Sequence, residues 1–297
     1  MDSSGQNTPA RKWRAFLLAG FVCLPVLAGA APASKSTRPS PDYVQLRPPD
    51  QAEGARLLAE FRGLGPAGDY YLDFELQVRP RRGDGQVFSG QLWGTRNAIG
   101  PLSRVVLHDP ANGPRRLLIQ NGPAPAVWAW LAEQAGPGPA DPAQLFAPLL
   151  PGTDLTAFDL QMPYLYWEEF VFEGVTKLRG RPAHVFLLYP PEEVTALQPE
   201  LHGVRVYLDT QFRALVQSQL IGEDNRPRRT LTVLDLKKID DQWMVKTIDL
   251  RDETTRDKTR FQVVRAAMGL DLAPRVFDPA ALAEQVAPPE RRIWLGR

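Results

Sequence analysis

The sequence predicts a mainly β protein of the α+β class, built on a single curved antiparallel sheet with a few short helices. Apolar and polar residues alternate from Tyr70 to Val78, the period of a strand with one buried and one solvated face. Similar short runs recur at roughly 10-residue spacing with turn residues between them, which is typical of an antiparallel meander. About 12 strands are predicted against two or three short helices, and a sheet of that size must curl because strands twist.

The first 30 residues have the order of a secretory signal peptide. A basic cluster at Arg11–Arg14 precedes an apolar run over 15–31 that ends in small residues. Ala28-Gly29-Ala30 fits the cleavage rule and places the mature start near Ala31. We therefore expect export to the periplasm, with no transmembrane span after cleavage. Retention of the apolar run as an anchor is the alternative, although the run is shorter than the roughly 20 residues of a typical span.

The single cysteine belongs to this segment. Val22 stands before Cys23, where a lipoprotein signal has a small residue, so we expect no lipid on Cys23. One cysteine also excludes an internal disulfide framework and a cysteine-rich zinc site.

Four segments make up the predicted organisation: the signal peptide (1–30), a proline-rich flexible spacer (31–49), one large domain (50–287) and a C-terminal tail (288–297). A short helix is predicted at the start of the domain from the apolar spacing of Leu57, Leu58 and Phe61, and Gly63 would end it. No change in composition divides residues 50–287 into two domains.

Strands follow this helix in two groups. The first group is separated by turn residues such as Gly83-Asp84-Gly85 and is predicted at 70–78, 86–95, 102–108, 116–120 and 126–131. A proline-rich insert then suggests short helices at 143–150 and 155–161, the second with Asp154 as its N-cap. The second group of strands is predicted at 168–178, 182–189, 203–209, 212–221, 228–239, 242–251 and 258–265.

Motifs of catalysis and of nucleic-acid binding are missing from the sequence. Thirty-five Lys and Arg residues balance 34 Asp and Glu residues, which disfavours a general nucleic-acid binder. His108, His184 and His202 have no metal-binding spacing, and no G-x-S-x-G nucleophile elbow occurs. Gly63, Gly65 and Gly68 match G-x-G-x-x-G, but they follow a helix and open a strand, the reverse of a dinucleotide site. We expect no enzyme activity, no cofactor and no metal site.

Large apolar side chains are more numerous than a thin sheet covered by two short helices requires. They are either ordinary core or the wall of an apolar cavity inside the curved sheet, as in barrels that enclose ligands. Under the second interpretation the predicted ligand-binding residues are Leu72, Phe74, Leu76, Trp93, Trp128, Trp130, Phe170, Phe172 and Leu187. Such a wall binds acyl chains, because each buried methylene contributes roughly 0.8 kcal/mol.

The order of motifs resembles the periplasmic lipoprotein-sorting proteins of the LolA and LolB superfamily, and more closely the group called outer-membrane lipoprotein-sorting proteins. The series begins at Thr153–Leu160, similar to the group's helix start, although Ala157 replaces its aromatic residue. It continues through 180–185, 206–209 with Phe212, 231–239, 243–248, Thr259, and Phe277-Asp278-Pro279 before a final helix.

This resemblance implies an incomplete barrel whose mouth is plugged by helices and whose cavity holds acyl chains of lipoproteins or phospholipids. Carriers of the superfamily hold their lid with a cavity arginine, and no arginine of this sequence aligns with it. An alternative from another class is an envelope protein–protein interaction or stress-sensing module, in which the Trp-rich segment 126–132 is an exposed patch that a protein partner covers. A hydrolase of unusual architecture is a third interpretation.

Overall fold

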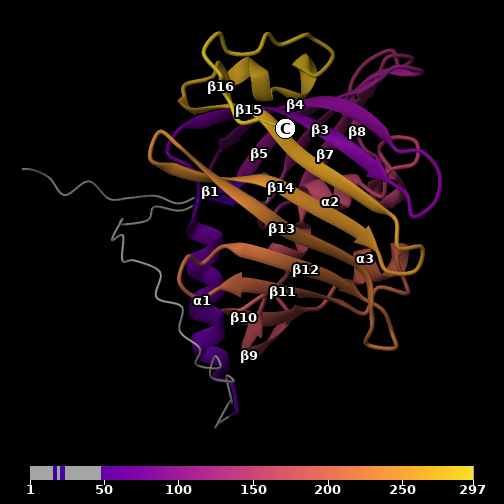
Figure 1. Cartoon of the computed structure of the whole chain (residues 1–297). Helices are drawn as coiled ribbons and strands as arrows, with labels where there is room; N and C mark the ends of the chain where they lie inside the picture. The colour runs from indigo at the N-terminus through magenta and orange to yellow at the C-terminus, as the bar shows by residue number, and fades with distance from the viewer. Residues whose placement is uncertain (1–15, 19–20, 24–47, 297) are drawn as a thin grey trace, which may run out of the picture.

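One open antiparallel sheet of 14 strands dominates the computed structural model, which describes residues 16–18, 21–23 and 48–296 (Figure 1). The strand order is β8-β7-β6-β5-β4-β3-β15-β14-β13-β12-β11-β10-β9, with β16 paired to β15. The strands at the two ends of this order, β8 and β9, are not paired with each other, so the sheet curves without closing. The predicted incomplete barrel and its mainly β class are confirmed.

The first group of strands is a continuous meander. Its strands are β3 (Asp69–Arg79), β4 (Gln86–Arg96), β5 (Pro101–Asp109), β6 (Gly113–Gln120), β7 (Ala126–Leu131) and β8 (Gly138–Pro139). Leu72 pairs with Leu92 and Leu92 with Val105, so apolar side chains from three strands share the concave face. In β5, every residue from Pro101 to Leu107 is buried, which shows that both faces of the sheet are covered there.

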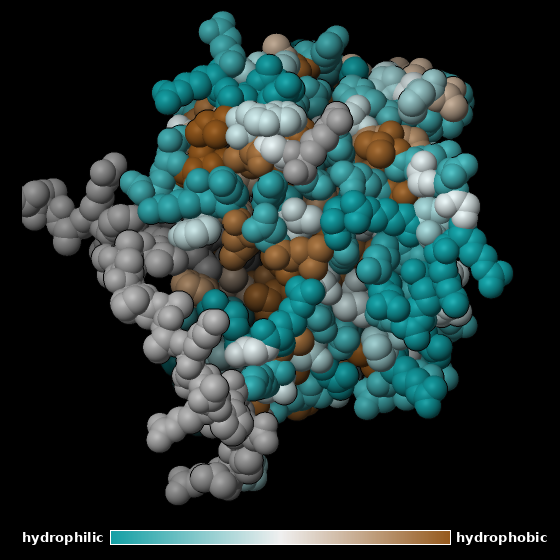
Figure 2. Space-filling view, in the orientation of Figure 1, coloured by the Kyte–Doolittle hydropathy of each residue, from teal (hydrophilic) through white to brown (hydrophobic). Residues whose placement is uncertain are grey.

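The second group completes the sheet. It consists of β9 (Phe170–Leu178), β10 (Arg181–Leu188), β11 (Gly203–Asp209), β12 (Leu215–Ile221), β13 (Pro227–Ile239), β14 (Gln242–Asp252), β15 (Lys258–Leu270) and β16 (Ile293–Trp294). Most of the outward side chains in the middle of β12–β15 are polar, among them Gln217, Thr232 and Asp249. Much of the face seen in Figure 2 is accordingly hydrophilic, with hydrophobic side chains gathered near its middle and top.

Helix α1 (Gln51–Gly63) lies against the edge strand β9. Asp50 caps it by accepting hydrogen bonds from the backbone of Ala52 and Glu53. The Gln51 side chain donates to the Phe172 carbonyl at 2.9 Å and accepts from the Phe172 amide at 2.8 Å. The amide group of Gln51 thus pairs with the edge backbone as a neighbouring strand would, which protects that part of an exposed edge.

The proline-rich insert forms short helical turns on the concave side: η1 (Pro142–Phe146), α2 (Ala157–Gln161) and η2 (Pro163–Tyr166). Thr156 caps α2, where the sequence predicted Asp154, because Thr156 and Asp159 form a reciprocal capping box. Helix α3 (Glu192–Leu197), between β10 and β11, was not predicted; it follows Pro190-Pro191 and has two glutamates in its first turn.

The C-terminal segment covers the convex face of β3–β7, at the top of Figure 1. It contains η3 (Pro274–Phe277), η4 (Pro279–Ala281) and β16, so the segment predicted as a tail, 288–297, contributes a strand to the sheet. The expected final helix after Pro279 is only one 3-10 turn. Pro288-Pro289 stops any helix there, and arginines of the sheet bind the carbonyls of 281–284.

Arg104 of β5 holds this segment in place. Its side chain is 1% exposed and donates hydrogen bonds to the carbonyls of Val276, Ala281, Leu282 and Glu284. Burial lowers the pKa of Arg104 to about 10, so the guanidinium keeps its charge at neutral pH. Backbone carbonyl oxygens thus solvate this buried cation, and the charge of Glu284 also favours it.

Two predicted segments fall largely outside the described residues. Of the predicted signal peptide only β1 (Phe16–Leu18) and β2 (Phe21–Cys23) are described; they pair antiparallel, and β2 lies against β14. Most of the predicted spacer, 31–47, is not described. In the part of the chain that the structure describes, no helix is long and apolar enough to span a membrane.

Replacement of Arg104 by methionine is expected to destabilise the protein by about 3 kcal/mol or more, because four carbonyls lose a charged donor. Urea unfolding measures this loss, and tryptophan fluorescence should shift to the red as the C-terminal segment leaves Trp128 and Trp130. The control is Arg82→Met at an exposed turn position, which should change stability by less than about 0.5 kcal/mol. Equal stability of Arg104→Met and wild type would show that this clamp is dispensable.

Candidate functional site

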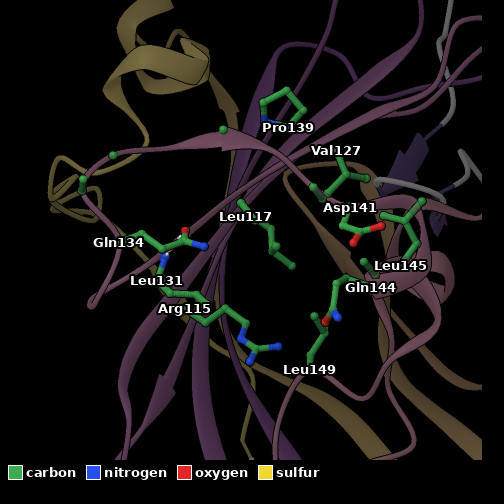
Figure 3. A pocket seen from close by; sticks show the side chains of 16 residues that line it. Arg115, Leu117, Val127, Leu131, Gln134, Pro139, Asp141, Gln144, Leu145 and Leu149 are labelled. Carbon is green, nitrogen blue, oxygen red and sulfur yellow. Dashed lines mark hydrogen bonds between the residues drawn. The ribbon is translucent and has the colours of Figure 1, made fainter.

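A cavity of about 570 Å³ lies on the concave side, between strands β6–β8 and the insert 134–149 (Figure 3). Its floor is formed by buried residues, Leu117, Val127, Leu149 and Ala157. Its rim is exposed and includes Gln134, Asp141 and Gln144. The volume is within the range of roughly 300–1,000 Å³ that small-molecule sites occupy.

Strand register decides which side chains line this cavity. Leu117 pairs with Ala129, and Ile119 pairs with Val127, so the odd-numbered residues of β7 face the cavity. Trp128 and Trp130 pair with Leu118 and Arg116 and therefore face the other side of the sheet. Because alternate side chains of a strand point to opposite faces, the tryptophans of β7 cannot share a wall with Val127, Ala129 and Leu131.

One cation projects into this largely apolar space. Arg115 belongs to the inward-facing residues of β6, opposite Leu131 and Leu107, and its guanidinium points toward Gln144 and Leu149 in Figure 3. Partial burial lowers the pKa of Arg115, and the charge of Asp109 opposes that shift. The other charged residue of the lining, Asp141, stands at the rim and caps η1 by accepting from the Ala143 amide at 2.9 Å.

A buried ion pair fixes helix α2 beside the cavity floor. Arg229 of β13 donates to the Asp159 carboxylate at 2.9 Å, and the Asp159 side chain is only 3% exposed. The same carboxylate oxygen accepts from the amide and the hydroxyl of Thr156. An arginine that ties an inner helix to the sheet is therefore present, although sequence comparison alone did not identify it.

The structure places eight of the nine predicted wall residues in three groups and leaves Leu187 outside them. Leu72, Phe74, Leu76 and Phe172 belong to the main core cluster, with Phe170 packed against it. Trp93 packs with Tyr71 at 5.1 Å between ring centroids, in a cluster under the C-terminal segment. Trp128 and Trp130 pack around Leu282 on the same outer side, and Leu187 pairs with the exposed Val171. The nine residues therefore do not form one wall.

None of the nine lines the 570 Å³ cavity. The concave face near Phe74 is filled, because the Phe74 ring lies over Gly90 and the Tyr70 ring lies over Gly94 of the neighbouring strand. A space beside Leu76 measures only about 10 Å³, which is about the volume for one water molecule. The binding roles assigned to Leu72, Phe74, Leu76, Phe170 and Phe172 stay predictions that require this packed interior to open.

The sequence interpretation missed the residues that do line the cavity. The prediction was based on aromatic and large apolar side chains, and it did not select the aliphatic residues Leu117, Ala129 and Leu149. In the sequence, nothing distinguishes Arg115 from the adjacent Arg116. The lining could have been found by pairing the predicted strand 116–120 with the predicted strand 126–131. A turn over 121–125 fixes their register, and the register decides which residues of the two strands share a face.

Replacement of Arg229 by methionine is expected to destabilise the protein by about 3–5 kcal/mol, since it leaves the Asp159 carboxylate buried without its cation. Addition of Asp159→Asn should recover part of that loss, and thermal or urea unfolding of the variants measures both effects. Arg256→Met, which breaks an exposed pair with Glu253, serves as the control and should change stability by less than about 1 kcal/mol. A loss for Arg229→Met no greater than that of this control would contradict the role of the pair.

Comparison with known proteins supports the assignment of the fold. A family model described as an uncharacterized protein matches residues 147–284. None of the curated proteins compared with the chain is a match. A DUF1329 family protein from Desulfovibrio piger has a TM-score of 0.66 at 15% identity, covering 78% of this chain and 98% of its own.

Two further solved structures have the same architecture. An outer membrane lipoprotein-sorting protein domain from Vibrio parahaemolyticus has a TM-score of 0.65 at 14% identity, covering 77% of this chain and 97% of its own. A LolA superfamily protein from Nitrosomonas europaea has a TM-score of 0.57 at 13% identity, covering 75% and 94%. The chain therefore has the incomplete-barrel fold of the LolA-like group.

Proposed function

We propose that this protein is a periplasmic lipid- or lipoprotein-binding protein that holds acyl chains in an apolar cavity without catalysis. The observation that carries the proposal is the 570 Å³ cavity on the concave side of the sheet, with Leu117, Val127 and Leu149 at its floor. An acyl chain in that space would gain roughly 0.8 kcal/mol for each buried methylene. The shared fold with a protein described as a lipoprotein-sorting domain supports the same class of ligand.

The chemistry of the lining favours binding over turnover. The described side chains around the cavity are aliphatic apart from Arg115, Gln134, Asp141 and Gln144. They include no serine, cysteine or histidine, so no nucleophile stands beside a base there.

A protein–protein role for the Trp-rich segment has less support. Trp128 and Trp130 are packed against Leu282, and the Arg116 guanidinium lies 4.5 Å from the Trp130 ring centroid. The chain's own C-terminal segment thus covers part of the patch that a partner would need.

Extraction of the natively purified, full-length protein with organic solvent, followed by mass spectrometry, tests the proposal. We expect lipid in stoichiometric amount from the wild type and at least a five-fold loss from Ala129→Phe, which places a ring in the cavity. Ala132→Phe is the matched control, because Ala132 is exposed and outside the lining, and it should retain the lipid. A wild-type protein that contains no lipid and takes up none from vesicles would refute the proposal.

A further inference from the structure

We propose that the ligand is an anionic amphiphile, whose carboxylate or phosphate head pairs with Arg115 while its acyl chain runs over Leu117 toward Leu149. This inference rests on the proposed function and specifies its ligand class. It starts from Arg115, the one cation of the cavity lining among the described residues.

Three other arginines of the sheet have partners within the protein. Arg104 and Arg116 bind backbone carbonyls of the C-terminal segment, and Arg229 binds Asp159. Arg115 differs from them: within the described part of the chain its guanidinium has no hydrogen bond and no ion pair within 4.0 Å, and only its backbone is paired, in the sheet. Its guanidinium is nevertheless partly removed from water and points into the cavity (Figure 3).

The nearby carboxylates are already engaged elsewhere. Asp109 accepts from the Ala111 amide at 2.9 Å and from the Asn112 side chain at 2.7 Å, within the exposed β5–β6 turn. Asp141 accepts from the Ala143 amide at the start of η1. Neither acid forms an ion pair with Arg115 in the described structure, so the guanidinium keeps its donors for a ligand.

The position of Arg115 suits the head of an amphiphile. It pairs with Leu131, whose amide donates to the exposed Gln134 of the rim, and the next inward-facing residue of β6 is Leu117 of the buried floor. A head group at Arg115 would therefore reach the rim amides while its chain enters the apolar end. The planar guanidinium binds a carboxylate or phosphate through two parallel hydrogen bonds, which a neutral head cannot match.

A neutral lipid would be a poorer occupant of this cavity. It would displace water from the guanidinium without supplying a counter-charge, and an unpaired charge in a drier environment is unfavourable. The cavity therefore selects for charge at one end and for apolar length at the other.

The preference for an anionic head is tested by calorimetric titration of the full-length protein at pH 8, after lipid extraction. The probes are dodecanoate, dodecyl phosphate, dodecanol and inorganic phosphate. We expect dodecanoate and dodecyl phosphate to bind at least ten-fold more tightly than dodecanol. Arg115→Met should weaken the binding of the two anionic probes at least ten-fold and leave the affinity for dodecanol unchanged. Arg115→Lys should lie between, because it keeps the charge and loses the planar fork. Arg115→Gln is the second neutral variant, and Arg82→Met is the exposed control that should bind all probes as the wild type does.

The outcomes separate this inference from the proposed function. Equal affinity of the wild type for dodecanoate and dodecanol, or equal weakening of both by Arg115→Met and Arg115→Gln, overturns the role of the anionic head and leaves acyl binding intact. Inorganic phosphate binding as tightly as dodecyl phosphate overturns the amphiphile in favour of a simple anion site. Failure of the wild type to bind any twelve-carbon probe refutes the proposed function itself.

Discussion

A sheet that is apolar on both faces must be covered on both faces, and in this chain the requirement falls on β3–β7. The insert between β7 and β9 packs on the concave face, and the C-terminal segment packs on the convex face. Since the sheet does not close, its curvature cannot bring the two ends together to bury the concave side. The incomplete cover over β6 and β7 leaves the cavity there.

Buried and half-buried arginines attach both covers to the sheet. On the convex side, Arg104 and Arg116 bind the carbonyls of a segment too short and proline-rich to satisfy them as a helix. On the concave side, Arg229 binds the carboxylate that also caps α2. Arg104 and Arg116 thus supply donors to backbone carbonyls, and Arg229 neutralises the Asp159 carboxylate, groups that burial would otherwise leave unpaired. Arg115 shares their partial burial without a partner of this kind, which is why the ligand class can be inferred from it.

The strands and the first helix were predictable because period-two alternation and turn residues report local geometry directly. Strands β3 and β4 agree with their predicted ranges to within one residue. The cavity was harder to predict from the sequence, because its lining depends on which face of the sheet each residue of β7 occupies. Tryptophans in a strand predict burial equally well on either face, and Trp128 and Trp130 are half-buried by a segment about 150 residues away in sequence. Arg104 was likewise unremarkable in sequence, since its carbonyl partners belong to that same distant segment.

The most direct test of the account is a crystal structure of the full-length protein with dodecanoate. We expect an acyl chain between Leu117 and Leu149, with the carboxylate within hydrogen-bond distance of the Arg115 guanidinium and the C-terminal segment unmoved over Trp128. A ligand bound on the outer face among the tryptophans, or a chain beside Phe74 with Arg115 turned away from it, would contradict the account.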